Sequence, residues 1–88
     1  MTIEREWLKS KLDTDLFLSD GLISFPEIGI RDYQVDLENV EMLGSLQSGD
    51  ELWIFSSPKD DWESLCGRAG LALVRDNEIV GSYVIFVN

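Results

Sequence analysis

The residue types that could form a ligand site gather in the second half of the sequence. Arg68 follows Gly67 in a Gly-Arg-Ala-Gly run, where glycine permits unusual backbone angles and close approach, and its guanidinium can bind an anionic ligand. A site of this kind would hold Arg68 beside Trp53 or Trp62. The alternative interpretation ends a helix at Gly67 and pairs Arg68 with a carboxylate such as Glu51. Arg68, Trp53 and Trp62 are therefore the candidate ligand-binding residues.

A carboxylate cluster and a single thiol are the other groups that could do chemistry. Asp60, Asp61 and Glu63 could bind a divalent cation or share a proton, but acids at the start of a helix are expected because they complement its dipole. Cys66 has no histidine base and no second cysteine, so we expect a small, buried core thiol. Neither group is assigned a catalytic role.

The sequence lacks the motifs of common enzyme classes. It has no histidine, which excludes Ser–His–Asp and Cys–His arrangements within the chain and removes a usual zinc ligand. It contains neither GxxxxGK[ST] nor GxGxxG. We therefore expect no metal and no cofactor. We favour a non-enzymatic protein over a minor enzyme or small-ligand-binding protein that uses Arg68 and nearby carboxylates.

Charge is the strongest compositional signal. Seventeen acidic residues face seven basic ones, a formal net charge of −10, and the excess is spread over both halves of the chain. Such a chain repels nucleic acids and anionic membranes, because binding to them depends on Lys and Arg. It can attract a basic partner protein, although solubility alone also explains the charge.

Length and patterning predict one domain spanning residues 1–88. One cysteine excludes an intramolecular disulfide, and charges occupy the N-terminal region where a signal peptide would be apolar. No apolar run approaches the roughly 20 residues that span a bilayer. We therefore expect a cytoplasmic protein.

The first half of the chain predicts a helix followed by irregular strands. Apolar residues recur at helical spacing over 2–12, with Thr2 as N-cap. Residues 22–25 form a strand ended by Pro26, and an edge strand continues over 28–33. Residues 35–47 fit either a helix, which is favoured, or an alternating strand.

The second half predicts a strand, a helix and a hairpin. Residues 51–55 are rich in aromatic and β-branched types. A helix with Ser57 as N-cap and Pro58 at its first position carries Trp62, Leu65 and Cys66 inward and stops near Gly67. Two apolar runs, 71–75 and 79–87, surround a short polar turn and so predict a β-hairpin.

The last strand is apolar on both of its faces. Tyr83, Ile85 and Val87 point one way, while Val84 and Phe86 point the other. A half-exposed strand would alternate apolar with polar residues, so this strand lies either inside a sheet covered on both faces or at an association surface. The second alternative predicts a homodimer.

The second half contains a distinctive pattern of short segments. The segments Gly-Asp-Glu-Leu-Trp at 49–53, Ser-Ser-Pro at 56–58 and Gly-Arg-Ala-Gly at 67–70 are followed by Ala-Leu-Val-Arg. This pattern resembles small bacterial proteins of uncharacterised function. The resemblance covers about residues 49–88 and implies a bacterial origin, and it brings no activity or catalytic residue with it.

Together these observations predict a small α+β domain. Its mainly antiparallel sheet ends in a C-terminal hairpin and is packed by an N-terminal helix and one or two short helices. The favoured function is that of an acidic protein-interaction module, either self-associating or masking a basic partner in the manner of an inhibitor or immunity protein.

Overall fold

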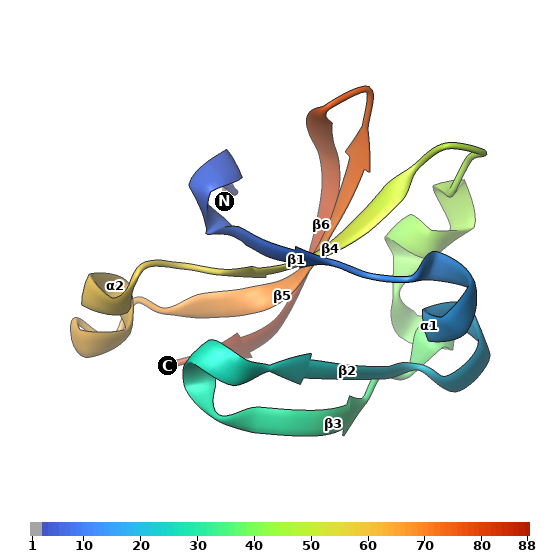
Figure 1. Cartoon of the computed structure of the whole chain (residues 1–88). Coiled ribbons are helices and arrows are strands. Elements are labelled where there is room, and N and C mark those ends of the chain that lie inside the picture. Colours follow the sequence, from blue (N-terminus) through green and yellow to red (C-terminus); the bar gives the residue numbers. More distant parts are fainter. Residues whose placement is uncertain (1–2) are drawn as a thin grey trace.

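The structure is a computed structural model that describes residues 3–88, and it contains two antiparallel sheets (Figure 1). The larger sheet has the strand order β1-β4-β5-β6, with β1 Leu8–Lys11, β4 Glu51–Ser56, β5 Arg68–Arg75 and β6 Glu78–Val87. The smaller sheet pairs β2 Leu22–Phe25 with β3 Ile30–Gln34. The predicted α+β class is confirmed.

Helices connect and flank the strands. The α-helices are α1 Thr14–Asp20 and α2 Lys59–Glu63. The described residues also form four short 3-10 helices: η1 Arg5–Trp7, η2 Pro26–Ile28, η3 Leu37–Asn39 and η4 Glu41–Ser45. No helix within residues 3–88 is long and apolar enough to cross a membrane.

The strands predicted in the second half are confirmed. β4 covers the aromatic run, and β5 and β6 form the C-terminal hairpin. Asp76 and Asn77, the turn residues, both have positive φ, as the two-residue turns that match strand twist require. The strand ended by Pro26 is also confirmed, because β2 stops at Phe25 and η2 begins at Pro26.

The larger of two core clusters lies between the four-stranded sheet and the β2–β3 hairpin, which runs below it in Figure 1. Phe25, Leu52, Leu71 and Leu73 are almost completely buried in this cluster. The ring of Phe86 meets Phe25 edge-on at a centroid distance of 5.3 Å. A smaller cluster, built on Ile3, Phe55 and Ala72, occupies the opposite face of the sheet.

The helix predicted over residues 2–12 is wrong. Thr2, its predicted N-cap, lies outside the described residues. The chain instead forms one 3-10 turn and then β1, which pairs with β4 through Leu8 and Phe55. Trp7 stacks on Phe55 with ring centroids 6.4 Å apart. A short isolated helix is marginal in water, so backbone pairing with β4 and burial against Phe55 outweigh the helical pattern.

A helix is found immediately afterwards, where none was predicted. The Asp13 side chain accepts a hydrogen bond from the Leu16 N–H at 3.1 Å and so caps α1. Phe17 is the buried residue of this helix. Gly21 ends α1 in the left-handed conformation that suits glycine (φ 68°).

Residues 35–47 follow the helical alternative only in short pieces. They form η3 and η4, separated by Val40, which is buried in the larger core cluster. Asp36 precedes η3, but its carboxylate accepts no capping hydrogen bond from a backbone N–H of that helix. Anchoring of Val40 in the core divides what the sequence predicted as one helix.

The prediction that Leu65 and Cys66 face inward is wrong. α2 begins at Lys59, two residues after the predicted cap Ser57, and ends at Glu63. Leu65 then takes a left-handed conformation (φ 60°), which turns the chain outward. Leu65 is 74% exposed, and the Cys66 thiol is exposed as well. The helix is too short to carry these two residues to the core.

β6 lies at the edge of the sheet rather than inside it. Register breaks at two points along its pairing with β5, and at the second of them Ala69 is opposite Phe86 while Gly70 is opposite Val84. The intervening Ile85 is a bulged residue, so Tyr83, Ile85 and Phe86 all pack against the larger core cluster. The strict alternation predicted for this strand is therefore wrong beyond Val84.

Candidate functional site

A pocket of about 420 Å³ lies where β4 meets α2. One wall comes from the end of β4 and the start of α2, the opposite wall from η2, and the rim from β1. Its lining residues are Lys9, Glu27, Ile28, Ser56, Ser57, Pro58, Lys59 and Trp62. Its volume falls in the range of small-molecule sites, roughly 300–1,000 Å³.

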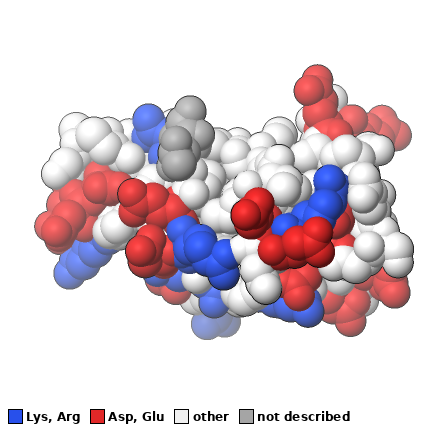
Figure 2. All heavy atoms as spheres, turned by 90° about the horizontal axis from the view of Figure 1, so that it is seen from above, with Lys and Arg blue, Asp and Glu red and all other residues white. Residues whose placement is uncertain are grey.

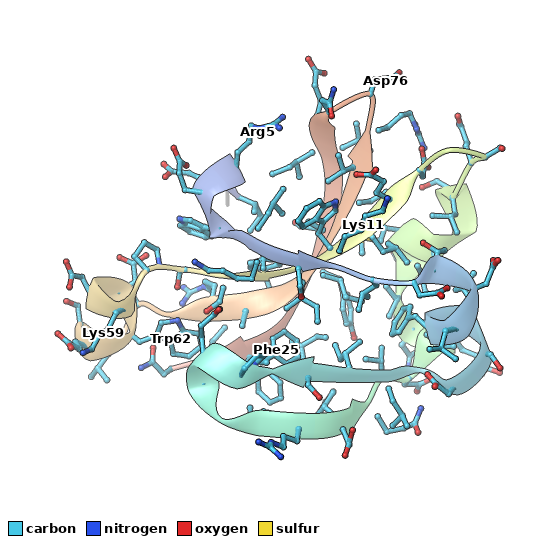
Figure 3. All side chains as sticks on the ribbon, viewed as in Figure 1. Arg5, Lys11, Phe25, Lys59, Trp62 and Asp76 are labelled. Carbon is cyan, nitrogen blue, oxygen red and sulfur yellow. The ribbon has the colours of Figure 1, made fainter. Side chains whose placement is uncertain are left out.

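Trp62 is the predicted site residue that lines this pocket, and its indole is fixed by the protein. Nε1–H donates to the Ser57 carbonyl at 3.2 Å. The ring lies against Gly67, where an added Cβ would come within 2.2 Å of it. Asn88 donates to the Trp62 carbonyl at 2.6 Å. Figure 3 shows Trp62 between α2 and the turn that joins β2 to β3.

Two buried hydroxyls lie beside the indole. Ser56 and Ser57 are 2% and 3% exposed. Ser57 Oγ accepts the Arg68 N–H at 2.9 Å, which leaves its own proton free within the described chain. Ser56 Oγ donates only a long hydrogen bond, 3.4 Å, to the Ser57 carbonyl. The pocket therefore contains two hydroxyl groups whose protons make no short hydrogen bond within the described residues.

Charged side chains surround the mouth of the pocket. Lys9 has no carboxylate within ion-pair distance among residues 3–88, and Lys59 makes only a long pair with Glu63 at 3.8 Å. Glu27 contributes one negative charge from η2. Two of the seven basic residues in an acidic chain thus meet at one hollow.

Trp53 lies on the opposite face of the sheet, in the smaller core cluster. Its Nε1–H donates to Glu51 at 3.0 Å, and Lys11 pairs with the same carboxylate at 3.1 Å. The hydrogen bond from Trp53 and the one from Lys11 lower the pKa of Glu51. This trio ties β1 to β4 and does not join the pocket.

Arg68 begins β5 behind the pocket wall and is half-buried. Its guanidinium donates to the Gly67 carbonyl at 2.8 Å. Glu51, the expected carboxylate partner, instead contacts Lys11 and Trp53. The structure thus does not bring Arg68 together with Trp53 or Trp62 in the pocket, and its role in ligand binding stays a prediction.

Sequence reasoning missed Lys9, Glu27 and the two serines as pocket residues. They are scattered between residues 9 and 57, and the topology alone unites them. One feature of the sequence could have identified the serines. Two adjacent hydroxyl residues follow an apolar strand, and buried polar side chains normally have hydrogen-bond partners.

A second charged arrangement has a structural role. Arg75 donates two hydrogen bonds to the Asp50 carboxylate, from Nε at 2.9 Å and from Nη2 at 2.8 Å, and a third to the Ser45 carbonyl. The hydrogen bond from Arg75, reinforced by the Gln47 N–H, lowers the pKa of Asp50 from 3.8 to about 2. This pair holds the loop before β4 against the end of β5.

Most carboxylates have no ion-pair partner within the described residues. Three ion pairs leave fourteen of the seventeen carboxylates and four of the seven cations without an oppositely charged partner among residues 3–88. Figure 2 shows carboxylates across the whole width of one face, with most of the blue cations next to red groups. The surplus charge covers the surface rather than one site.

The two edges of the larger sheet differ in chemistry. β1 is four residues long and carries Lys9 and Lys11, the kind of charged side chain that discourages edge pairing. β6 is ten residues long, and no charged residue occurs from 79 to 88. Val80 is 48% exposed on this strand.

Comparison with protein-family models, with curated proteins and with solved structures found no match to this chain.

Proposed function

We propose that this protein is a non-enzymatic interaction module of the bacterial cytoplasm that pairs with a second copy of itself through the edge of β6. The observation that carries the proposal is the uncharged stretch from 79 to 87 on a ten-residue edge strand. Edge strands normally carry charges, prolines, β-bulges or a cover that discourage pairing; β6 has register breaks at two points of its pairing with β5 but no charge or proline over residues 79–87. Two copies of a chain with a net charge of −10 repel each other, and contact through an uncharged surface keeps this repulsion lowest.

The packing around β6 supports self-association through the edge of this strand. β3 does not pair with β6. Residues 33–36 and 83–85 line a hollow of about 160 Å³ between the two strands, and the Tyr33 ring meets Phe86 edge-on at a centroid distance of 4.9 Å. Ser82 is exposed at the middle of the strand, opposite the buried Ala72. An antiparallel pairing of β6 with its copy extends the sheet across a two-fold axis and buries Val80.

Sedimentation velocity tests the self-association. We expect a dimer for the wild type between about 10 µM and about 1 mM, the range in which weak complexes form. Ser82→Lys places a charge in the edge and should give a monomer. Ser10→Lys adds the same charge to the opposite edge, β1, and should leave the dimer intact. A monomeric wild type, or a dimer that survives Ser82→Lys, contradicts the proposal.

The surface carboxylates favour a second candidate, binding of a basic partner protein. All carboxylates except Asp50, Glu51 and Asp61 are exposed, and most have no cation nearby. Complementary charge accelerates encounter and makes it sensitive to salt. This arrangement suits an inhibitor that masks a basic surface.

A pull-down from a nuclease-treated bacterial lysate tests the second candidate. One basic protein retained in equal amount with the bait at low salt and released at moderate salt is the expected result. A partner whose binding does not change with salt argues against recognition by charge.

A further inference from the structure

The pocket between β4, α2 and η2 combines features that the self-association of β6 does not use. It lies on the face of the sheet that carries the β2–β3 hairpin, and none of its lining residues belongs to β6. Ligand binding in this pocket is therefore independent of the proposed self-association. Its walls, donors and charges together define the kind of molecule that fits.

The apolar wall is formed before any ligand arrives. The Trp62 indole is held by its hydrogen bond to Ser57 and by contact with Gly67. Ile28 and Pro58 complete the apolar surface. A fixed wall costs little conformational entropy on binding, which favours a compact apolar or aromatic group against it.

The polar groups of the pocket are mostly donors. The buried Ser56 and Ser57 hydroxyls each retain a proton that no short hydrogen bond occupies within the described chain. The ammonium groups of Lys9 and Lys59 add donors at the rim. A ligand that satisfies such a set must bring acceptor atoms, and a carboxylate brings two oxygens.

The charges limit the ligand to a single negative charge. Lys9 and Lys59 contribute two positive charges, and Glu27 contributes one negative charge on the opposite wall. The lining side chains alone therefore sum to +1, part of which Glu63 offsets through its pair with Lys59 at 3.8 Å, whereas the chain as a whole carries −10. A dianion would meet both Glu27 and the repulsion of the remaining surface.

We infer that this pocket binds a small organic monocarboxylate with an apolar or aromatic body. The body lies against Trp62, Ile28 and Pro58, and the carboxylate accepts hydrogen bonds from the serine hydroxyls and from Lys9. Lys59 lies at the mouth as a second cation, with a side chain that is 88% exposed and extends away from the body of the protein in Figure 3.

Titration followed by ¹⁵N–¹H NMR of the full chain tests the inference with three probes of the same shape. Phenylacetate carries the carboxylate, phenylacetamide is its neutral counterpart, and phenethylammonium reverses the charge. We expect saturable shifts of the Trp62 Nε1–H and Ser57 N–H signals with phenylacetate, and at least fivefold weaker binding of the other two. Equal binding of all three probes, or no saturation with phenylacetate by about 20 mM, a concentration that exceeds fragment-level affinity, overturns it.

A pair of lysine variants separates the site from general charge. Lys9→Gln should weaken phenylacetate binding about threefold to fivefold, the effect of one exposed charged contact. Lys11→Gln removes the next lysine of β1, which pairs with Glu51 on the other face, and should leave the affinity unchanged. Both positions are exposed, so both variants should fold. Equal losses in the two variants would show that the anion responds only to net charge.

Discussion

Replacement of Gly70 by alanine should be among the most damaging single-methyl changes in this protein. An added Cβ would stand 2.0 Å from the Tyr83 carbonyl oxygen and 3.0 Å from the Ile85 nitrogen, both backbone atoms of β6. The first distance is over 1 Å shorter than the 3.4 Å at which ordinary contact begins. The strand cannot rotate away like a side chain, so β5 and β6 must separate at the bulge.

The size of the effect follows from that separation. Overpacking alone costs about 1–3 kcal/mol, and each disrupted hydrogen bond of the ladder adds about 1 kcal/mol. We therefore expect the free energy of unfolding to fall by about 3 kcal/mol or more. Such a loss is a large part of the total stability of a small domain, about 5–15 kcal/mol.

Urea unfolding followed by far-UV circular dichroism measures the loss, with Gly81→Ala as the matched control. Gly81 lies on the partner strand, its φ is not positive, and an added Cβ would meet Met42 and Leu73 at 3.6 and 3.7 Å, which is ordinary contact. Gly81→Ala should change stability by less than about 1 kcal/mol, because it also reduces the entropy of the unfolded chain. Two variants of equal stability would refute the reasoning.

Three further predictions concern an ion pair, a thiol and a helix cap. Arg75 lowers the pKa of Asp50 from 3.8 to about 2, so the stabilisation from this ion pair is complete above pH 3.8 and is lost as the pH falls through 2. Asp50→Asn should therefore remove this part of the pH dependence of the urea midpoint. An unchanged pH dependence in the variant would contradict the role of the pair. Cys66 is exposed, so Ellman's reagent should modify one thiol in the native protein as fast as in urea, and strong protection would disprove the exposure. Asp13→Ala should cost about 1 kcal/mol by removing the cap of α1, whereas Asp15→Ala in the same turn should cost only a few tenths; equal losses would argue against the cap.

The strands of the second half were predictable because local signals agree there. Residues 51–55 favour a strand by composition, and Asp76–Asn77 tolerates the positive φ of a tight hairpin turn. Pro26 marked the end of β2 for the same local reason, its missing N–H. Each of these signals acts within a few residues.

The N-terminal helix failed because the deciding contact is distant in sequence. Ile3, Trp7 and Leu8 have helical spacing, yet what they meet is Phe55 and Ala72 across the sheet. Nothing near residue 8 indicates that β4 has a free edge to receive it. Tertiary pairing therefore overrode the local pattern.

The candidate pocket was predictable only in part. Trp62 was named as an aromatic neighbour of Arg68 in a ligand site, and it lines the pocket without Arg68. Lys9 and Glu27 were not, because a single exposed lysine or glutamate has no distinguishing pattern. Only the folded arrangement of β1, η2 and β4 places them together.

The strand order β1-β4-β5-β6 has a consequence for the order of assembly. β4, β5 and β6 follow one another along residues 51–87, so their ladders close through short connections. Pairing of β1 with β4 instead brings Leu8 next to Phe55 and closes a much longer loop, so it has a larger entropic cost of loop closure. We therefore expect the C-terminal meander to form first and β1 to dock last. Amide hydrogens of Ser10 and Lys11 should then exchange with deuterium before those of Leu71 and Leu73, through local detachment of β1.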